Sequence, residues 1–140
     1  MELLRTDRII LRSWAEGDLA AFFAIYSRDE VARWLGPRPR RAVTDLDDAR
    51  RRLNAWRDFH GRLEAPYGLW AIALITGPTE PVGPVGTALL LPLSDADGPT
   101  GEIEVGWHLH PDHQGHGLAT ESARRCSASC RPARRIGCWH

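Results

Sequence analysis

Hydrophobic positions change their spacing along the chain, and each change marks a new element. Arg8 to Trp14 is a run of mostly aliphatic residues, which predicts a first strand. After it, apolar residues recur at helical spacing up to Gly36-Pro37, with Asp18 as the predicted N-cap. The regularity breaks near Ser27. This part of the pattern therefore predicts one strand followed by two helices.

A third helix and a series of strands complete the pattern. Leu46, Ala49, Leu53 and Trp56 form one apolar face, which predicts a helix that starts with a near-capping box at Thr44 and ends by about Gly61. Three apolar runs separated by Gly- and Pro-rich turns then predict three consecutive strands: Tyr67–Ile75, Val85–Leu93 and Gly101–Pro111. A last helix begins near Gln114. The order predicts an α+β fold with an antiparallel meander.

Composition narrows the classes of function. With 140 residues, the chain is long enough for one domain. Its 18 basic residues balance its 18 acidic ones, so it lacks the charge of a nucleic-acid-binding protein. There is no apolar run of membrane length and no signal-peptide pattern at the start, so we expect a cytoplasmic protein with no membrane partner. His and Cys residues crowd the C-terminal part, but none has the paired spacing of a structural zinc site, so no metal is expected.

The segment "HPDHQGHGLAT" is the candidate for chemistry. A strand that enters a glycine-containing turn and then a helix aims unpaired backbone N–H groups, together with the positive end of the helix dipole, at one point. Such a point binds phosphate. The alternative is a tight turn in which Gly115 and Gly117 serve backbone conformation alone.

The same segment carries a family resemblance. Gln114, Gly117 and Ala119 match the Q-x-x-G-x-A form of the acetyl-CoA pyrophosphate loop. "LRTDRIILRSW" and "EIEVGWHLHP" resemble other parts of the same proteins. The chain from about Leu4 to Ala123 thus resembles the GNAT N-acetyltransferase superfamily, in particular its RimJ/RimL-like branch. The resemblance implies a mixed sheet flanked by helices, and an enzyme that transfers an acetyl group from acetyl-CoA to a primary amine, for which a protein N-terminus is one candidate.

The resemblance also implies site residues. Strand residues Trp107, His108 and Leu109 are expected to lie along the pantetheine, and the Thr120 hydroxyl adds a contact to the phosphates. Backbone N–H groups are expected to hold the pyrophosphate at six positions: Gln114, Gly115, His116, Gly117, Leu118 and Ala119.

Glu104 is the predicted general base. Related enzymes often carry a carboxylate at this point of the strand. Strand alternation places five residues on one face: Glu102, Glu104, Gly106, His108 and His110. The competing interpretation is that the two glutamates are ordinary solvent-facing residues of a sheet. The tryptophans at 34, 56 and 70 fall on apolar faces and are predicted core residues, although Trp34 adjoins the loop that borders the acceptor site in the family.

The C-terminal segment departs from the family pattern. After about residue 123 the chain is rich in Arg, Ser and Cys, has a proline at Pro132 and offers few large apolar residues. We therefore expect a partial GNAT domain over 1–123 and a non-homologous, disordered tail over 124–140, as in a truncated or frameshifted gene. The domain would lack the family's fifth strand, fourth helix and final hairpin. Its open strand edge would permit a homodimer. The alternative function is then a non-catalytic remnant that binds CoA or a partner.

Overall fold

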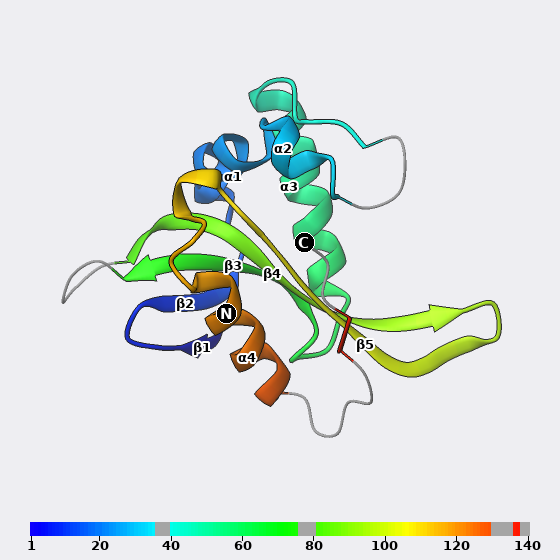
Figure 1. The fold of residues 1–140 in the computed structure, drawn as a ribbon. Coiled ribbons are helices and arrows are strands. Elements are labelled where there is room, and N and C mark those ends of the chain that lie inside the picture. The colour runs from blue at the N-terminus through cyan, green and yellow to red at the C-terminus, as the bar shows by residue number, and fades with distance from the viewer. Residues whose placement is uncertain (36–39, 76–80, 130–135, 138–140) are drawn as a thin grey trace.

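A six-stranded sheet forms the centre of the molecule (Figure 1). The computed structural model describes residues 1–35, 40–75, 81–129 and 136–137. The strands follow one another in sequence order across the sheet: β1 Glu2–Arg5, β2 Ile9–Ser13, β3 Gly68–Ile75, β4 Pro81–Asp95, β5 Gly98–Leu109 and β6 Ile136–Gly137. Each of the first five strands runs antiparallel to its neighbour, whereas β6 is parallel to β5. The predicted meander of three strands is confirmed as β3, β4 and β5.

Helices cover both faces of this sheet (Figure 1). One face carries three of them: α1 Leu19–Tyr26, α2 Asp29–Ala32 and α3 Leu46–Gly61. The other face carries α4 Leu118–Ser129. Two short 3₁₀ helices, Glu16–Asp18 and Pro111–His113, precede α1 and α4.

The two hydrophobic cores meet at the central strand β3. Trp70 and Ile72 belong to the core under α4, and Ala71 belongs to the core under α1 and α3; all three are fully buried. A strand that is buried on both faces has no polar alternation. This explains why the sequence "LWAIALI" is a continuous apolar run.

Most element predictions agree with the structure, with differences at the ends. The predicted break near Ser27 is confirmed, because α1 ends at Tyr26 and α2 begins at Asp29. The N-cap of α3 is Asp45 and not Thr44, since the Asp45 carboxylate accepts the N–H of Asp48 at 2.7 Å. The last helix begins at Leu118 and not near Gln114, because two glycines with positive φ intervene. Strand β1 was not predicted at all.

The C-terminal segment differs from expectation. Helix α4 runs past residue 123 to Ser129, and Cys126 is fully buried in one core with Ile103 and Val105. Strand β6 then pairs with β5 at Ile103 and Glu104. The predictions of a truncated domain and of a missing C-terminal strand and helix therefore find no support. The tail predicted over 124–140 includes helix and strand, and its positions 130–135 and 138–140 lie outside the described residues.

Candidate functional site

The turn between β5 and α4 has the backbone shape that a phosphate cradle requires. Gly115 has φ of 82° and Gly117 has φ of 76°, conformations that residues with a Cβ rarely adopt. The chain passes from the Pro111–His113 turn through these two glycines into the first turn of α4. The positive end of the α4 dipole therefore points at the loop.

The loop also presents unsatisfied hydrogen-bond donors. Among the described residues, no protein group accepts a hydrogen bond from the backbone N–H groups of Gly115 to Thr120; the first bond of α4 runs from the Glu121 N–H to the Gly117 carbonyl, at 3.0 Å. Gln114 differs from its neighbours, because its N–H donates to the Pro111 carbonyl at 3.2 Å. Its side-chain amide donates to the Leu109 carbonyl at 3.3 Å. Six N–H groups, from Gly115 to Thr120, thus have no acceptor among the described residues and remain for an anion, which fits a pyrophosphate.

Arg8 holds the loop from the opposite side. Its guanidinium donates to the His116 carbonyl at 2.8 Å and forms an ion pair with Glu121. Glu121 also accepts the Thr6 hydroxyl at 2.5 Å. Partial burial of Glu121 favours its neutral form, but the hydrogen bonds from Thr6 and Arg8 outweigh this and lower its pKa. The β1–β2 turn therefore fixes the position of the loop through a charged side chain.

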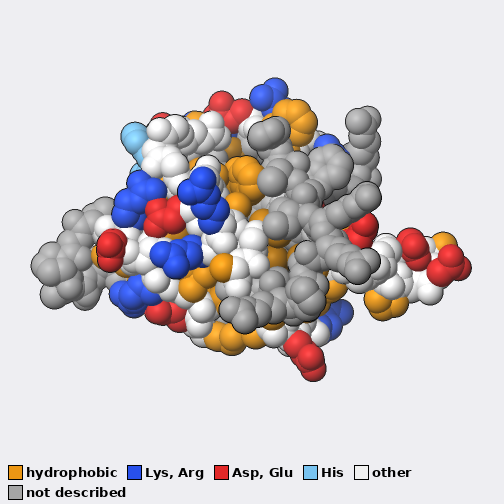
Figure 2. Space-filling view, turned by 60° about the horizontal axis from the view of Figure 1, so that its bottom comes forward, with side chains coloured by type: hydrophobic (Ala, Val, Ile, Leu, Met, Phe, Trp, Pro, Cys, Tyr) orange, Lys and Arg blue, Asp and Glu red, His pale blue; other side chains and the backbone are white. Residues whose placement is uncertain are grey.

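Figure 2 shows a face of the molecule on which basic and acidic side chains lie close to one another. Next to Arg8 and Glu121, a shallow hollow is lined by Arg5, Asp7 and Arg125 as well. Its described lining has three arginines and two carboxylates, of which Arg8 and Glu121 form an ion pair.

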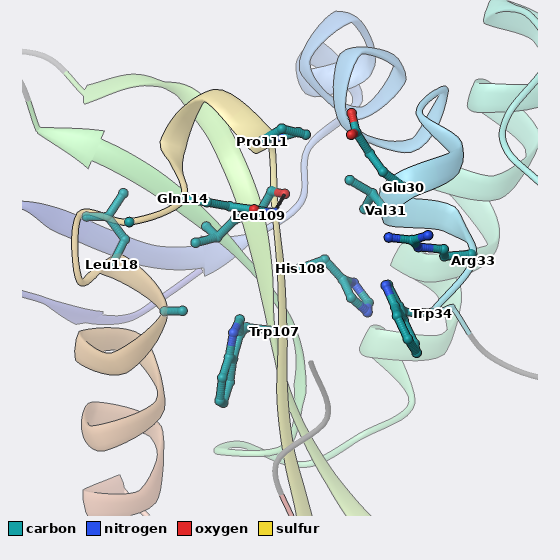
Figure 3. Close-up of a pocket in the computed structure, with 12 residues that line it drawn as sticks. Glu30, Val31, Arg33, Trp34, Trp107, His108, Leu109, Pro111, Gln114 and Leu118 are labelled. Atoms are coloured by element: carbon teal, nitrogen blue, oxygen red, sulfur yellow. Dashed lines mark hydrogen bonds between the residues drawn. The ribbon is translucent and has the colours of Figure 1, made fainter.

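A first pocket of about 450 Å³ extends from the loop along the end of β5 to α2 (Figure 3). Trp107, His108 and Leu109 form its floor, and Gln114, Gly115, Leu118 and Ala119 close it on the loop side. Glu30, Val31, Arg33 and Trp34 close it on the α2 side. Seven of the predicted cofactor residues therefore line one cavity.

A second pocket of about 530 Å³ adjoins the first and shares Trp34, Trp107 and His108 with it. Its further lining consists of Leu35, Arg40, Trp56, Phe59, Leu69, Leu89, Leu91 and Glu104. The two pockets meet at His108, so a long ligand in the first pocket and a second ligand in the other would come together there.

His108 is held by a buried hydroxyl pair. Its Nδ1 lies 3.3 Å from the Tyr26 hydroxyl, which in turn lies 2.5 Å from Thr87 Oγ1. Desolvation lowers the pKa of His108 to about 4, so this imidazole is neutral at physiological pH. Burial also raises the pKa of Tyr26, whose hydroxyl therefore keeps its proton.

Of the five residues predicted to share a face of β5, two line the second pocket and one lies beyond the end of the strand. Glu104 and His108 both line the second pocket, and Glu104 is partly buried, unlike a fully solvated residue. His110 does not share this face, because β5 ends at Leu109 and the His110 ring accepts the N–H of Asp112. The ring caps the 3₁₀ turn.

Trp34 corrects the prediction of three core tryptophans. Trp70 is fully buried and Trp56 is partly buried, but Trp34 is 53% exposed and lines both pockets. Helix α2 ends at Ala32, so Trp34 lies beyond the helix to which the spacing had assigned it. Helical spacing could not show that Trp34 lies at a cavity.

Several residues of the site were missed by sequence reasoning. Arg8 and Thr6 reach the loop from more than 100 positions away, and Tyr26 reaches His108 across 82 positions. Local patterns carry no signal for such contacts.

Neither a metal-binding cluster nor a membrane-spanning helix occurs in the part of the chain that the structure describes. There, no group of three or more His, Cys, Asp or Glu side chains is arranged to hold a metal ion. None of the helices in that part is long and apolar enough to cross a membrane.

Known proteins resemble this chain in sequence and in fold. The family model described as "Acetyltransferase (GNAT) domain" matches residues 8–135. An uncharacterized N-acetyltransferase of Bacillus subtilis (strain 168), YoaA, is 27% identical over 120 residues, which cover 85% of this chain and 60% of that protein. The chain thus spans less than two thirds of this relative.

Solved structures extend the likeness to the fold. An acetyltransferase (GNAT family) from Bacillus anthracis superposes with a TM-score of 0.67 at 17% identity, over 99% of this chain and 72% of the other. RimL, the ribosomal L7/L12 alpha-N-protein acetyltransferase, solved in complex with coenzyme A, gives 0.66 at 14% identity, over 99% and 73%.

Proposed function

The chain belongs to the acetyltransferase (GNAT) domain family, and from this premise we propose that it transfers the acetyl group of acetyl-CoA to a primary amine. One observation carries the proposal: the backbone N–H groups of Gly115 to Thr120 have no acceptor among the described residues and adjoin a pocket that runs along β5. Gly115, Leu118 and Ala119 of this stretch line that pocket, so unpaired donors and a cavity lie side by side, as a phosphate-binding loop requires.

The loop would hold the pyrophosphate of acetyl-CoA. The N–H groups of Gly115, His116, Gly117, Leu118 and Ala119 supply donors, and the Thr120 hydroxyl adds one. Gln114 would hold the loop in position, since its side-chain amide donates a hydrogen bond to the Leu109 carbonyl. From the loop, the pantetheine would extend along Trp107 to Leu109 and bring the thioester to the junction at His108.

The acceptor would enter through the second pocket, where Glu104 lies. Amines with an ordinary pKa arrive as ammonium ions, so a proton must leave before nitrogen can attack. We assign this proton to Glu104, directly or through a water molecule. The nitrogen lone pair then forms the C–N bond, the C–S bond breaks, and the second proton lost by nitrogen ends on the departing sulfur. Because the two pockets adjoin, both substrates would be held close together, which lowers the entropic part of the activation barrier.

RimL is described as acting on a protein N-terminus, and a protein N-terminus is one acceptor that this chemistry permits here. What the proposal requires is only a primary amine that reaches His108 from the second pocket.

The loop is tested by replacing Gly117 with valine and measuring CoA binding by calorimetry. A side chain at φ of 76° is strained, and its methyl groups would occupy the space that the phosphates approach. We expect CoA to bind the parent protein, and to bind Gly117→Val at least about tenfold more weakly.

Gly101→Val is the matched control. Gly101 has the same φ of 76° and open space around its Cβ position, but it lies at the far end of β5. It should retain CoA binding at the parent level. Equal CoA affinity in folded Gly117→Val would show that the two glycines serve backbone conformation alone. CoA binding without acetyl transfer to any amine would favour the non-catalytic binding module instead.

A further inference from the structure

The second pocket is lined mostly by aromatic and aliphatic side chains. Trp34, Trp56, Phe59, Leu91 and Trp107 contribute to its walls. Two of these large side chains are unusually open for their type, since Trp34 is 53% exposed and Phe59 is 40% exposed. Exposed aromatic residues that face one cavity are typical of a binding site for an apolar group.

The polar groups of this pocket are few. Glu104 is the only carboxylate among the described residues that line it. His108 is neutral at physiological pH, because desolvation lowers its pKa to about 4. The third polar residue, Arg40, carries a positive charge and donates to the Arg33 carbonyl at 3.2 Å. The pocket thus offers one negative charge to a ligand, and a positive charge at another point of its wall.

This arrangement favours one kind of amine. A single ammonium group can pair with Glu104 and lie against indole faces, which attract cations. A second ammonium on the same ligand would lie among apolar walls or near Arg40, and none of the other described lining residues is a carboxylate that could balance it. The ligand body has to be apolar to replace water on the tryptophan and leucine side chains.

We propose that the second pocket binds an apolar primary amine, that is, an aromatic or branched aliphatic group on a short linker with a single ammonium. This inference rests on the proposed function and names the acceptor class of that site. The volume of about 530 Å³ lies in the range of pockets that take small molecules.

The first experiment measures binding alone. Trp34, Trp56 and Trp107 line the pocket and provide intrinsic fluorescence, so the intact chain can be titrated with 2-phenylethylamine, with spermidine and with ethanolamine. We expect 2-phenylethylamine to change the emission at concentrations about tenfold or more below those of the other two amines. This readout does not depend on CoA binding or on turnover, so it separates failure of the inference from failure of the proposed function.

Phe59→Ala tests the apolar wall. It should weaken 2-phenylethylamine about tenfold while leaving the affinity for CoA unchanged, because Phe59 lines only the second pocket. Leu46→Ala is the control: Leu46 lies on the same helix and is 51% exposed, but it lines neither pocket. Leu46→Ala should bind both ligands like the parent.

The steady-state assay gives the second readout. With acetyl-CoA saturating, 2-phenylethylamine should have the lowest KM of the three amines, and Phe59→Ala should raise that KM without changing the KM for acetyl-CoA. Preference for spermidine, or equal binding of all three amines, would overturn the proposal. So would preference for a tetrapeptide with a polar first residue, since a peptide acceptor carries polar amides into the apolar walls.

Discussion

At the scale of single residues, the site depends on side chains whose charge is fixed by their surroundings. His108 stands at the junction of both pockets, and the buried hydroxyls of Tyr26 and Thr87 hold its ring. Since its pKa is lowered to about 4, His108 is uncharged at the point where the proposed acceptor would arrive as an ammonium ion. A positive charge at this point would repel such an acceptor, so the neutral imidazole would leave Glu104 as the group that attracts it.

Glu104→Gln tests whether Glu104 acts as the general base. The substitution keeps the volume and removes the proton acceptor, so we expect kcat to fall by about 10²- to 10⁴-fold. CoA affinity should stay near the parent value, because Glu104 lines only the second pocket. The measurement is steady-state acetylation together with CoA calorimetry. Glu102→Gln, on the same face of β5, serves as the control. Unchanged turnover of Glu104→Gln across pH would exclude Glu104 and direct attention to a water chain or to Glu102.

At the scale of elements, hydrophobic patterns predicted most of the helices and strands, and they failed where distant contacts decide. The break between α1 and α2, the meander and the glycine turn all follow from local spacing. The edge strand β1 does not, because its pairing with β2 is what holds its four residues in place. The course of α4 past residue 123 also escaped prediction. The burial of α4 depends on Cys126, which packs in the same core as the buried residues of β5. Cys126 is a small apolar residue within a polar stretch of sequence.

The candidate site also has one part that local sequence predicted and another that depends on distant contacts. The residues from Trp107 to Thr120 are contiguous and were recognisable as a motif. Other parts of the chain supply Arg8, the residues on the α2 side of the first pocket and the aromatic residues of the second pocket. Only the fold brings them to the motif. Sequence therefore indicated a cofactor loop but not the chemistry of the acceptor side.

The start of α3 provides a prediction for an element. Asp48 is 3% exposed, and it accepts hydrogen bonds from the Thr44 N–H at 3.1 Å and from Arg41 at 3.0 Å. The Thr44 bond is the main reason that its pKa falls to about 2, and Arg41 adds to it. The carboxylate therefore stabilises the fold above its unfolded pKa of about 4, and this contribution disappears as the pH falls from about 4 to about 2.

Asp48→Asn should accordingly lower the free energy of unfolding by about 1–2 kcal/mol at pH 7, a value reduced from the full pKa shift because the arginine partners are solvated. The difference from the parent should shrink as the pH falls below 4. Urea unfolding at several pH values measures both quantities. Asp47→Asn, an exposed neighbour in the same helical turn, should change stability by only a few tenths of a kcal/mol. A deficit in Asp48→Asn that did not depend on pH would contradict the role of the charge.

At the scale of the whole molecule, the sheet needs a cover on each face. Three helices cover one face, and in the described part of the chain α4 alone covers the other. Leu118 at the first position of α4 and Cys126 two turns later are both buried against β5 and its neighbours. The helix that begins at the proposed phosphate loop thus also closes the hydrophobic core, so cofactor binding at that loop would be linked to global stability through one element.

The reactivity of the Cys126 thiol can show whether α4 covers the hydrophobic core. Its side chain is fully buried in the same core as Ile103 and Val105, so its thiol should react only when the core opens. In a Cys130→Ser, Cys138→Ser protein, which keeps this single thiol, alkylation should be slow in buffer and fast in urea, with the urea midpoint of labelling matching that of circular dichroism. Saturating CoA should slow the labelling further, because a ligand of the folded state reduces the population of the open state. Rapid alkylation in buffer by folded protein would show instead that the packed domain ends near residue 123, as the composition of the C-terminal segment had indicated, and that α4 beyond this point does not cover the sheet.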